Sequence, residues 1–257
     1  MKKEIFIIGN IIGLAITLFV NFLATALPLN GKTTGELSDS YPNLFVPAGY
    51  VFAIWGVIYI LLIIFVVFQA LPKQRNDDFH QEISGLFIVS SVANSVWIFL
   101  WHYEQVFFSL ITMLVLLASL ILIYWRLKIG LNPVPLNTKL AVHTPFSVYL
   151  GWITVATVAN VTAFLVFINW DGLGISETTW TLLVLSIATT IGIIIILQRK
   201  DVAYTLVPIW AFIGISLKQI GNANEVSFYA AICALILFVV LVTWLAYQKK
   251  KESRMEV

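Results

Sequence analysis

Long apolar segments separated by short polar loops constrain the fold of this chain more than any other feature. Hydropathy predicts eight of them, at residues 5–27, 47–71, 83–101, 105–126, 140–168, 178–198, 203–218 and 226–247. Backbone polar groups in lipid must be satisfied within their own segment, so each span should be an α-helix. The segment 203–218 is the weakest, because it is short and contains Pro208. The predicted fold class is an all-α membrane protein with about eight transmembrane helices.

Composition agrees with this class. Only 11% of the 257 residues are charged, whereas a typical soluble domain carries about 25%. No polar stretch is long enough to fold as a separate soluble domain. The single cysteine, Cys233, lies within an apolar run, so the sequence predicts neither a disulfide nor a cysteine metal site.

Lysine and arginine residues are divided unevenly between the two sets of loops. Thirteen of the fifteen lie at the termini or in alternate loops. These are Lys2, Lys3, Lys73, Arg75, Arg126, Lys128, Lys139, Arg199, Lys200, Lys249, Lys250, Lys251 and Arg254. Only Lys32 and Lys218 lie on the opposite side. The positive-inside rule therefore predicts a multi-pass protein of the cell membrane, with both termini in the cytoplasm. No inner loop carries a long basic run, so we expect membrane lipids and no nucleic acid as partners.

The second span begins with a row of aromatic residues. Pro47 precedes Phe52, Trp55 and Tyr59, which are spaced i, i+3 and i+7 and so share one helical face. The row runs inward from the end of the span, beyond the usual interfacial belt of aromatic residues. Two interpretations stay open. The row either lines a cavity for a flat, apolar ligand or packs as a seam between helices.

The third and fifth spans place further aromatic and polar residues at a similar depth. Asn94 and Trp97 are i, i+3 neighbours, as are Tyr149 and Trp152, and Asn160 shares a face with Trp152. With a rise of about 1.5 Å per residue, Asn94 and Asn160 lie on the order of 10 Å below the outer ends of their spans. Such neutral polar residues form either interhelical hydrogen bonds or the few polar contacts of an apolar pocket.

The longest outer loop, residues 28–46, would lie above these residues. It is rich in glycine, proline, asparagine and serine, which favour turns. Loops of this length are often lids or binding loops, and the alternative is a solvated connector.

The sequence contains no motif that indicates an enzyme. The patterns HExxH, GxSxG, GxGxxG and the P-loop are absent. His80 and His143 lie at inner ends of spans and His102 at an outer end, so the three histidines cannot form one metal site. The spans carry no Asp, Glu or Arg away from their ends, which argues against an ion-coupled pump. The sequence thus predicts no metal and no required cofactor.

Residues 1–170 resemble the TspO/MBR family, the translocator or tryptophan-rich sensory proteins. The resemblance lies in an aromatic run at the start of the second helix, an Asn-x-x-Trp motif in the third and a Tyr-x-x-Trp-x-x-x-Ala-x-x-x-Asn motif in the fifth. The matching residues are Pro47, Phe52, Trp55, Tyr59, Asn94, Trp97, Tyr149, Trp152, Ala156 and Asn160. Val46 and Val148 stand where the family has proline, and Phe52 is one residue closer to Trp55 than in the family.

The resemblance implies that residues 1–170 form a five-helix bundle with a pocket for porphyrin, heme or another flat ligand under the first loop. Residues 171–257 would then add three transmembrane helices and a basic cytoplasmic tail. A homodimer is also implied, because family members are often dimers. The predicted ligand-binding residues are Phe52, Trp55, Tyr59, Asn94, Trp97, Tyr149, Trp152 and Asn160.

Three classes of function remain open at this point. The first is a membrane protein that binds a tetrapyrrole-like ligand for sensing, regulation or transport. The second is a membrane enzyme that degrades a bound porphyrin, and the third is an unrelated eight-helix transporter of small solutes. The sequence favours the first class, because the pocket region offers no acid, base or nucleophile.

Overall fold

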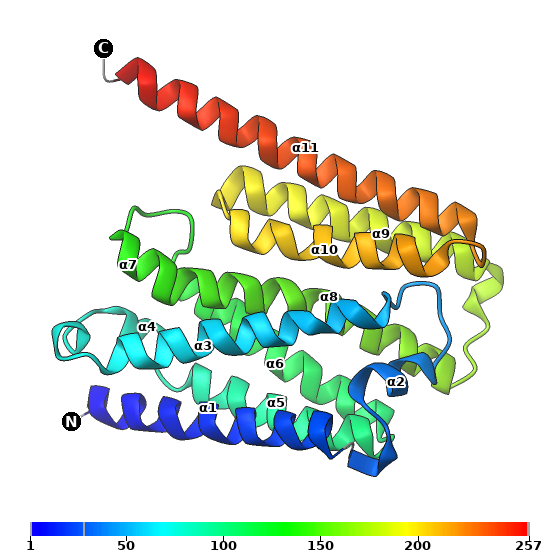
Figure 1. Cartoon of the computed structure of the whole chain (residues 1–257), viewed down its shortest axis with the longest axis horizontal. Helices are drawn as coiled ribbons and strands as arrows, with labels where there is room; N and C mark the ends of the chain where they lie inside the picture. The colour runs from blue at the N-terminus through cyan, green and yellow to red at the C-terminus, as the bar shows by residue number, and fades with distance from the viewer. Residues whose placement is uncertain (1, 28, 256–257) are drawn as a thin grey trace.

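The computed structural model describes residues 2–27 and 29–255, so Pro28 at the start of the predicted outer loop lies outside the described residues. Within these ranges every regular element is helical, and the long helices run side by side (Figure 1). They are α1 (Lys2–Ala26), α3 (Ile54–Ala70), α5 (Leu86–His102), α6 (Val106–Arg126), α8 (Thr144–Phe167), α9 (Glu177–Ile194), α10 (Val202–Gln219) and α11 (Asn224–Met255). The predicted all-α membrane class is confirmed.

Seven segments of the described chain are long and apolar enough to cross a membrane, as judged by length and composition. The eighth predicted span, α5, has 17 residues, which corresponds to about 26 Å against a hydrocarbon core of about 30 Å. Helix α5 begins at Leu86, a few residues after the approximate start predicted for this span at residue 83. A separate short helix, α4 (Phe79–Ile83), ends there, and Ser84 adopts a positive φ of 44° that no continuing α-helix allows.

The weakest predicted span, 203–218, is a continuous helix from Val202 to Gln219 despite Pro208. Proline has no N–H, so it leaves the carbonyl of Tyr204 without its usual helical donor. Gly151 of α8 lies against this carbonyl, since a Cβ on Gly151 would be 3.1 Å from the Tyr204 oxygen. The glycine therefore allows the two helices to pack closely at the proline.

Two spans are not entirely α-helical, which corrects the prediction that all of them would be. The short α7 (Leu136–Thr138) and a π-helical turn, η4 (Lys139–His143), lead into α8, and a second π-helical turn, η6 (Ile195–Arg199), follows α9. The last helix also runs further than its predicted end at residue 247. No glycine or proline interrupts Asn224–Met255, so the basic segment continues α11.

The helices are arranged as a bundle with an added layer. In the bundle α1 packs against α3 and α5, α5 against α6, and α6 against α8. The added layer consists of α9, α10 and α11, and it meets the bundle mainly where α10 packs against α8 (Figure 1). The bundle therefore has one face covered by the last third of the chain.

The predicted outer loop is folded onto the bundle. It contains one 3₁₀ turn, η1 (Leu29–Gly31), and a short helix, α2 (Thr34–Asp39), and a second 3₁₀ turn, η2 (Gly49–Ala53), follows it at the start of the second predicted span. Thr33 and Glu36 form a capping box at the start of α2, and the hydrogen bonds from Thr33 lower the pKa of the Glu36 carboxyl. Leu37 and Phe45 are each only 1% exposed. The segment is thus a packed cover over one end of the bundle, and it is not a solvated connector.

The loops rich in Lys and Arg lie at one end of the helices, and the loops with few of these residues lie at the other end. Helix α1 begins and α11 ends at the same end, which also carries the turns after α3, α6 and α9 (Figure 1). Segment 29–46 and the turn after α10 lie at the opposite end. The alternation agrees with the charge pattern, and the assignment of the first end to the cytoplasm stays a prediction.

Candidate ligand-binding site

Trp55, in the first turn of α3, is the centre of a cluster of aromatic side chains. Its ring stacks on Tyr59, with centroids 5.6 Å apart and planes at 22°. It meets Tyr149 and Trp152 of α8 edge-on, at 6.1 Å and 6.2 Å, and lies 6.5 Å from Trp97 of α5. Each such pair contributes on the order of 1 kcal/mol beyond its buried area. The aromatic row predicted in the second span therefore faces α5 and α8.

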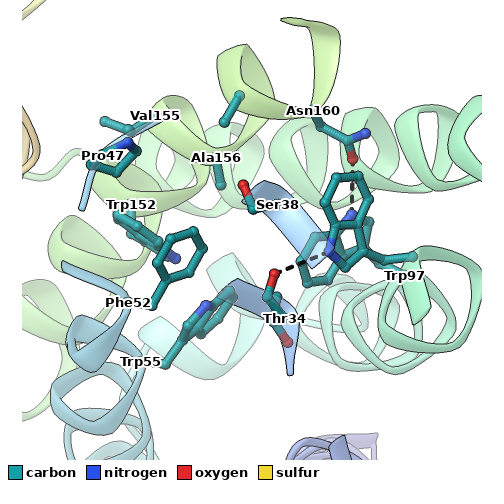
Figure 2. A pocket seen from close by; sticks show the side chains of 12 residues that line it. Thr34, Ser38, Pro47, Phe52, Trp55, Trp97, Trp152, Val155, Ala156 and Asn160 are labelled. Carbon is teal, nitrogen blue, oxygen red and sulfur yellow. Dashed lines mark hydrogen bonds between the residues drawn. The ribbon is translucent and has the colours of Figure 1, made fainter. Parts of the chain in front are cut away.

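A small cavity adjoins this cluster beneath α2 (Figure 2). Its lining comes from α2, the entry to α3, α5 and α8. The lining residues are Thr34, Ser38, Pro47, Phe52, Trp55, Trp97, Trp101, Trp152, Val155, Ala156, Ala159 and Asn160. The cavity volume is about 30 Å³, enough for about two water molecules. Ligand pockets usually measure roughly 300–1,000 Å³, so this cavity is too small for such a ligand without a rearrangement of its walls.

Five of the eight predicted ligand-binding residues line the cavity, namely Phe52, Trp55, Trp97, Trp152 and Asn160. Phe52 and Trp152 lie on one side of it, and Trp97 and Asn160 lie on the other (Figure 2). Phe52 belongs to η2 and meets Trp152 edge-on at 5.8 Å. The structure thus brings together residues from three predicted spans.

The other three predicted residues, Tyr59, Asn94 and Tyr149, do not line the cavity. Asn94 is fully buried and joins three helices. Its amide donates to the Tyr149 hydroxyl at 3.0 Å, and its oxygen accepts from the amide of Asn21 on α1 at 2.7 Å. Asn94 therefore forms an interhelical hydrogen-bond network, which is one of the two roles left open by the sequence.

Asn160 combines both roles. Its side-chain oxygen accepts from the indole N–H of Trp97 at 2.9 Å, and its amide donates to the Ser109 hydroxyl of α6 at 3.2 Å. The same side chain lines the cavity and is 2% exposed. Asn160 thus holds Trp97 in place against the cavity.

Trp152 carries a buried polar group without a hydrogen-bond partner. It is 2% exposed, and its indole N–H has no hydrogen-bond partner among the described residues. A buried donor without an acceptor costs on the order of 1–3 kcal/mol. Every other tryptophan of the wall except Trp55 has a bonded indole, since Trp97 donates to Asn160 and Trp101 donates to the Thr34 carbonyl. Trp152 therefore carries an unpaired buried donor beside the cavity.

His102, at the end of α5, fastens the cover over the cavity. Its Nδ1 is 3.0 Å from the carbonyl oxygen of Leu29, and its Nε2 is 3.0 Å from the hydroxyl of Thr34. A carbonyl only accepts, so Nδ1 carries a proton. The amide of Asn30 also donates to the His102 carbonyl at 3.0 Å. Three hydrogen bonds thus tie residues 29–34 to the end of α5.

Sequence analysis missed several residues at this site. Trp101 could have been found, because it follows Trp97 by one helical turn and extends the same face. The roles of Thr34, Ser38 and His102 depend on how the outer segment folds back onto the bundle, and no local spacing encodes that contact.

The added helices also reach the site through α10. The backbone N–H of Ala48 donates to the carbonyl of Gly214 at 3.2 Å, and the indole N–H of Trp210 donates to the carbonyl of Val51 at 3.2 Å. These bonds hold the turn η2, which lies between Pro47 and α3. Helix α10 therefore fixes the position of two lining residues, Pro47 and Phe52.

The chemical character of the cavity follows from its lining. Aromatic and aliphatic side chains form most of the wall, with two hydroxyls, one amide and the free indole N–H as polar groups. No Asp, Glu, His, Lys, Arg or Cys is among the lining residues. The cavity therefore offers mainly apolar contact surface, with a few uncharged hydrogen-bonding groups.

A protein-family model described as "TSPO-like protein" matches residues 6–243. The match runs from α1 into α11, so it includes the three helices that follow residue 170. No curated protein and no solved structure matches the chain.

Proposed function

Since the chain belongs to the TSPO-like family of multi-pass membrane proteins, we propose that its aromatic cluster binds a flat, apolar ligand of the porphyrin or tetrapyrrole kind, heme included. Binding would serve sensing, regulation or transport of that ligand. The cavity wall offers stacking surfaces and hydrogen-bond donors but no titratable group, so the proposal is binding and not catalysis.

The free indole N–H of Trp152 is the observation that carries this proposal. Folding has left a buried donor at the wall of an aromatic cavity without an acceptor. A tetrapyrrole presents flat apolar faces together with nitrogen and carboxylate acceptors at its edges. Contact of one such acceptor with Trp152 would offset the cost of the unpaired N–H, while the neighbouring rings contribute stacking.

Ligand entry requires the cover to move, because the cavity holds only about 30 Å³. The segment from Leu29 to Asp39 is the mobile part in this proposal. Its hydrogen bonds to His102 and Trp101 are few, and Lys218 of α10 forms an ion pair with Asp39 at its far end. The free energy needed to open this cover would be subtracted from the affinity of the ligand.

Two substitutions at Trp152 test the proposal. Trp152→Phe removes the N–H but keeps an aromatic ring, and Trp152→Leu also removes the ring. We expect each to weaken protoporphyrin binding about five- to tenfold, the factor that roughly 1 kcal/mol implies. Absorbance titrations of the purified protein in detergent would measure the affinity without depending on tryptophan fluorescence.

Trp97→Phe provides the matched control for stability. It removes an indole N–H that is bonded to Asn160, so it should destabilise the fold, whereas Trp152→Phe should not. Unchanged protoporphyrin affinity in Trp152→Phe, Trp152→Leu and Trp55→Leu would show that the aromatic cluster is only a packed seam. Light scattering of the same samples would test the homodimer that the resemblance implies.

A further inference from the structure

A second, larger cavity lies at the outer end of the molecule between α8 and α9. Its volume is about 530 Å³, within the range of roughly 300–1,000 Å³ that ligand pockets show. It is separate from the aromatic site, with which it shares no lining residue. Its walls come from the segment before η2, the second half of α8, the turn after α8 and the start of α9. The lining residues are Pro42, Asn43, Leu44, Phe45, Val158, Val161, Thr162, Leu165, Val166, Asn169, Trp170, Asp171, Gly172, Ile175, Glu177, Trp180, Thr181 and Val184.

The inner part of this cavity is effectively apolar. Valine and leucine side chains of α8 and α9 form most of it. The two threonine hydroxyls in the wall are already bonded within their own helices, Thr162 to the Ala159 carbonyl and Thr181 to the Glu177 carbonyl. A chain of methylene groups can therefore lie there without leaving a polar group of the wall unpaired.

The mouth of the cavity has a different character. The rings of Trp170 and Trp180 lie 5.4 Å apart at 52°, and Trp180 is held by a bond from its indole N–H to the Gly172 carbonyl at 2.8 Å. The carboxylates of Asp171 and Glu177 also line the cavity, where they accept from the backbone N–H groups of Leu173 and Leu44, and no Lys, Arg or His is among the lining residues. Aromatic rings together with acidic groups are the usual surroundings of a bound ammonium group.

Helix ends reinforce this negative character. Helix α8 ends at Phe167, next to the cavity, and its C-terminal carbonyls carry partial negative charge. The positive end of α9 is offset by its own Glu177 and by the Ser176 hydroxyl, which accepts from the Thr179 N–H. Lys218 lines an adjoining cavity, and its ammonium group forms an ion pair with Asp39.

We propose that this cavity binds an amphiphile with an alkyl chain and an ammonium head, the chain lying between α8 and α9 and the head between Trp170, Trp180 and the two carboxylates. The electrostatics disfavour an anionic head. The occupant is either a membrane lipid with an ammonium-bearing headgroup or a free cationic amphiphile, because both present the same chemistry to the site.

Calorimetric titration of the full chain in phosphatidylglycerol nanodiscs tests this proposal. The heat measured with protein-free discs is subtracted. Lauroylcholine is compared with 3,3-dimethylbutyl laurate, which has the same shape but no charge. We expect saturable, protein-dependent binding of lauroylcholine, about tenfold tighter than that of the neutral ester. Equal binding of the two esters, or no binding above that of empty discs, would overturn the proposal.

Two tryptophan substitutions on α9 locate the binding. Val184 lines the cavity, whereas Ile187 lies one turn further along and is 60% exposed. Val184→Trp should abolish saturable binding, and Ile187→Trp should keep it. Trp170→Leu, at a partly exposed position, should weaken lauroylcholine binding several-fold while leaving the neutral ester unaffected. If Val184→Trp and Ile187→Trp bind alike and Trp170→Leu has no effect, the cavity is not the site.

Nanodiscs of phosphatidylcholine then separate the two sources of ligand. If membrane lipid is the occupant, these discs should lower the apparent affinity for lauroylcholine by competition. If a free amphiphile is the occupant, the affinity should match that in phosphatidylglycerol discs after subtraction of empty discs. Protoporphyrin binding at the aromatic site should not change in any of these samples, so this proposal can fail without affecting the other.

Discussion

Gly214 of α10 allows the added helices to support the ligand-binding site, and its replacement by alanine should disturb both stability and binding. A Cβ at this position would lie 2.1 Å from Val51 Cγ2 and 3.2 Å from Pro47 Cβ. Val51 is fully buried, and its branched side chain has little rotational freedom. The added methyl group must therefore push α10 and the turn η2 apart.

The size of the effect follows from two opposing terms. Overpacking a closed core usually costs about 1–3 kcal/mol. Alanine in place of a glycine within a helix recovers roughly 0.5–1 kcal/mol of backbone entropy. Gly56 of α3 isolates the second term, because a Cβ there would meet nothing within 4 Å. We expect Gly214→Ala to be less stable than Gly56→Ala by about 1–3 kcal/mol.

Reversible unfolding in mixed micelles, followed by circular dichroism, measures this difference. Protoporphyrin titration of the same samples measures the effect at the site, and we expect weaker binding only for Gly214→Ala, because Pro47 and Phe52 line the cavity on either side of Val51. Equal stability of the two variants would refute the close packing between α10 and η2. A loss of stability with unchanged affinity would show that α10 does not position the site.

Two further predictions concern the topology and the cover. A cysteine introduced at the exposed Asn222 should react with an impermeant thiol reagent added outside intact cells, and one introduced at Asn76 should not. The native Cys233 is buried and should add little background. The opposite labelling pattern would reverse the predicted orientation. His102→Ala removes the side-chain hydrogen bonds to Leu29 and Thr34. Because each bond contributes roughly 1 kcal/mol, amide hydrogen exchange in residues 29–40 should accelerate by about tenfold or more. Unchanged protection of these amides would show that His102 does not hold the cover.

Hydropathy predicts most of the fold because a bilayer allows few alternatives to helices of sufficient length. Seven of the predicted spans correspond to continuous apolar helical segments. Hydropathy alone does not locate the start of α5, because the break at Ser84 is marked only by the Ser84-Gly85 pair, a turn signal that an average over a long window does not register. The π-helical turns before α8 and after α9 leave the apolar pattern unchanged, so the sequence carries no sign of them.

The candidate site is predictable in part for a similar reason. Helical periodicity places Trp55, Trp97 and Trp152 on facing surfaces, and the structure brings their rings together. Helical periodicity does not indicate whether facing rings leave a cavity between them. Here the space that remains measures only about 30 Å³. The contact of α10 with the site depends on Gly214. The sequence alone does not show that this glycine packs against Val51, because the two residues are far apart along the chain.

Removal of the last three helices separates what the bundle does from what α10 adds. The packing of α1, α5, α6 and α8 lies entirely before residue 170, so a chain that ends after Asp171 should insert and remain helical. It loses the Gly214 carbonyl and the Trp210 N–H that hold η2, and it exposes the close-packed surface of Gly151.

We therefore expect the shortened chain to bind protoporphyrin more weakly than the full chain, by at least the factor seen in Gly214→Ala. Titration of both proteins in the same detergent measures this. The division of the chain at residue 170 stays a prediction until then, although the family match includes α10. If the shortened chain is monodisperse and binds as tightly as the full chain, the first 170 residues form a self-sufficient binding unit, and the contacts of α10 with η2 serve only to attach the added helices.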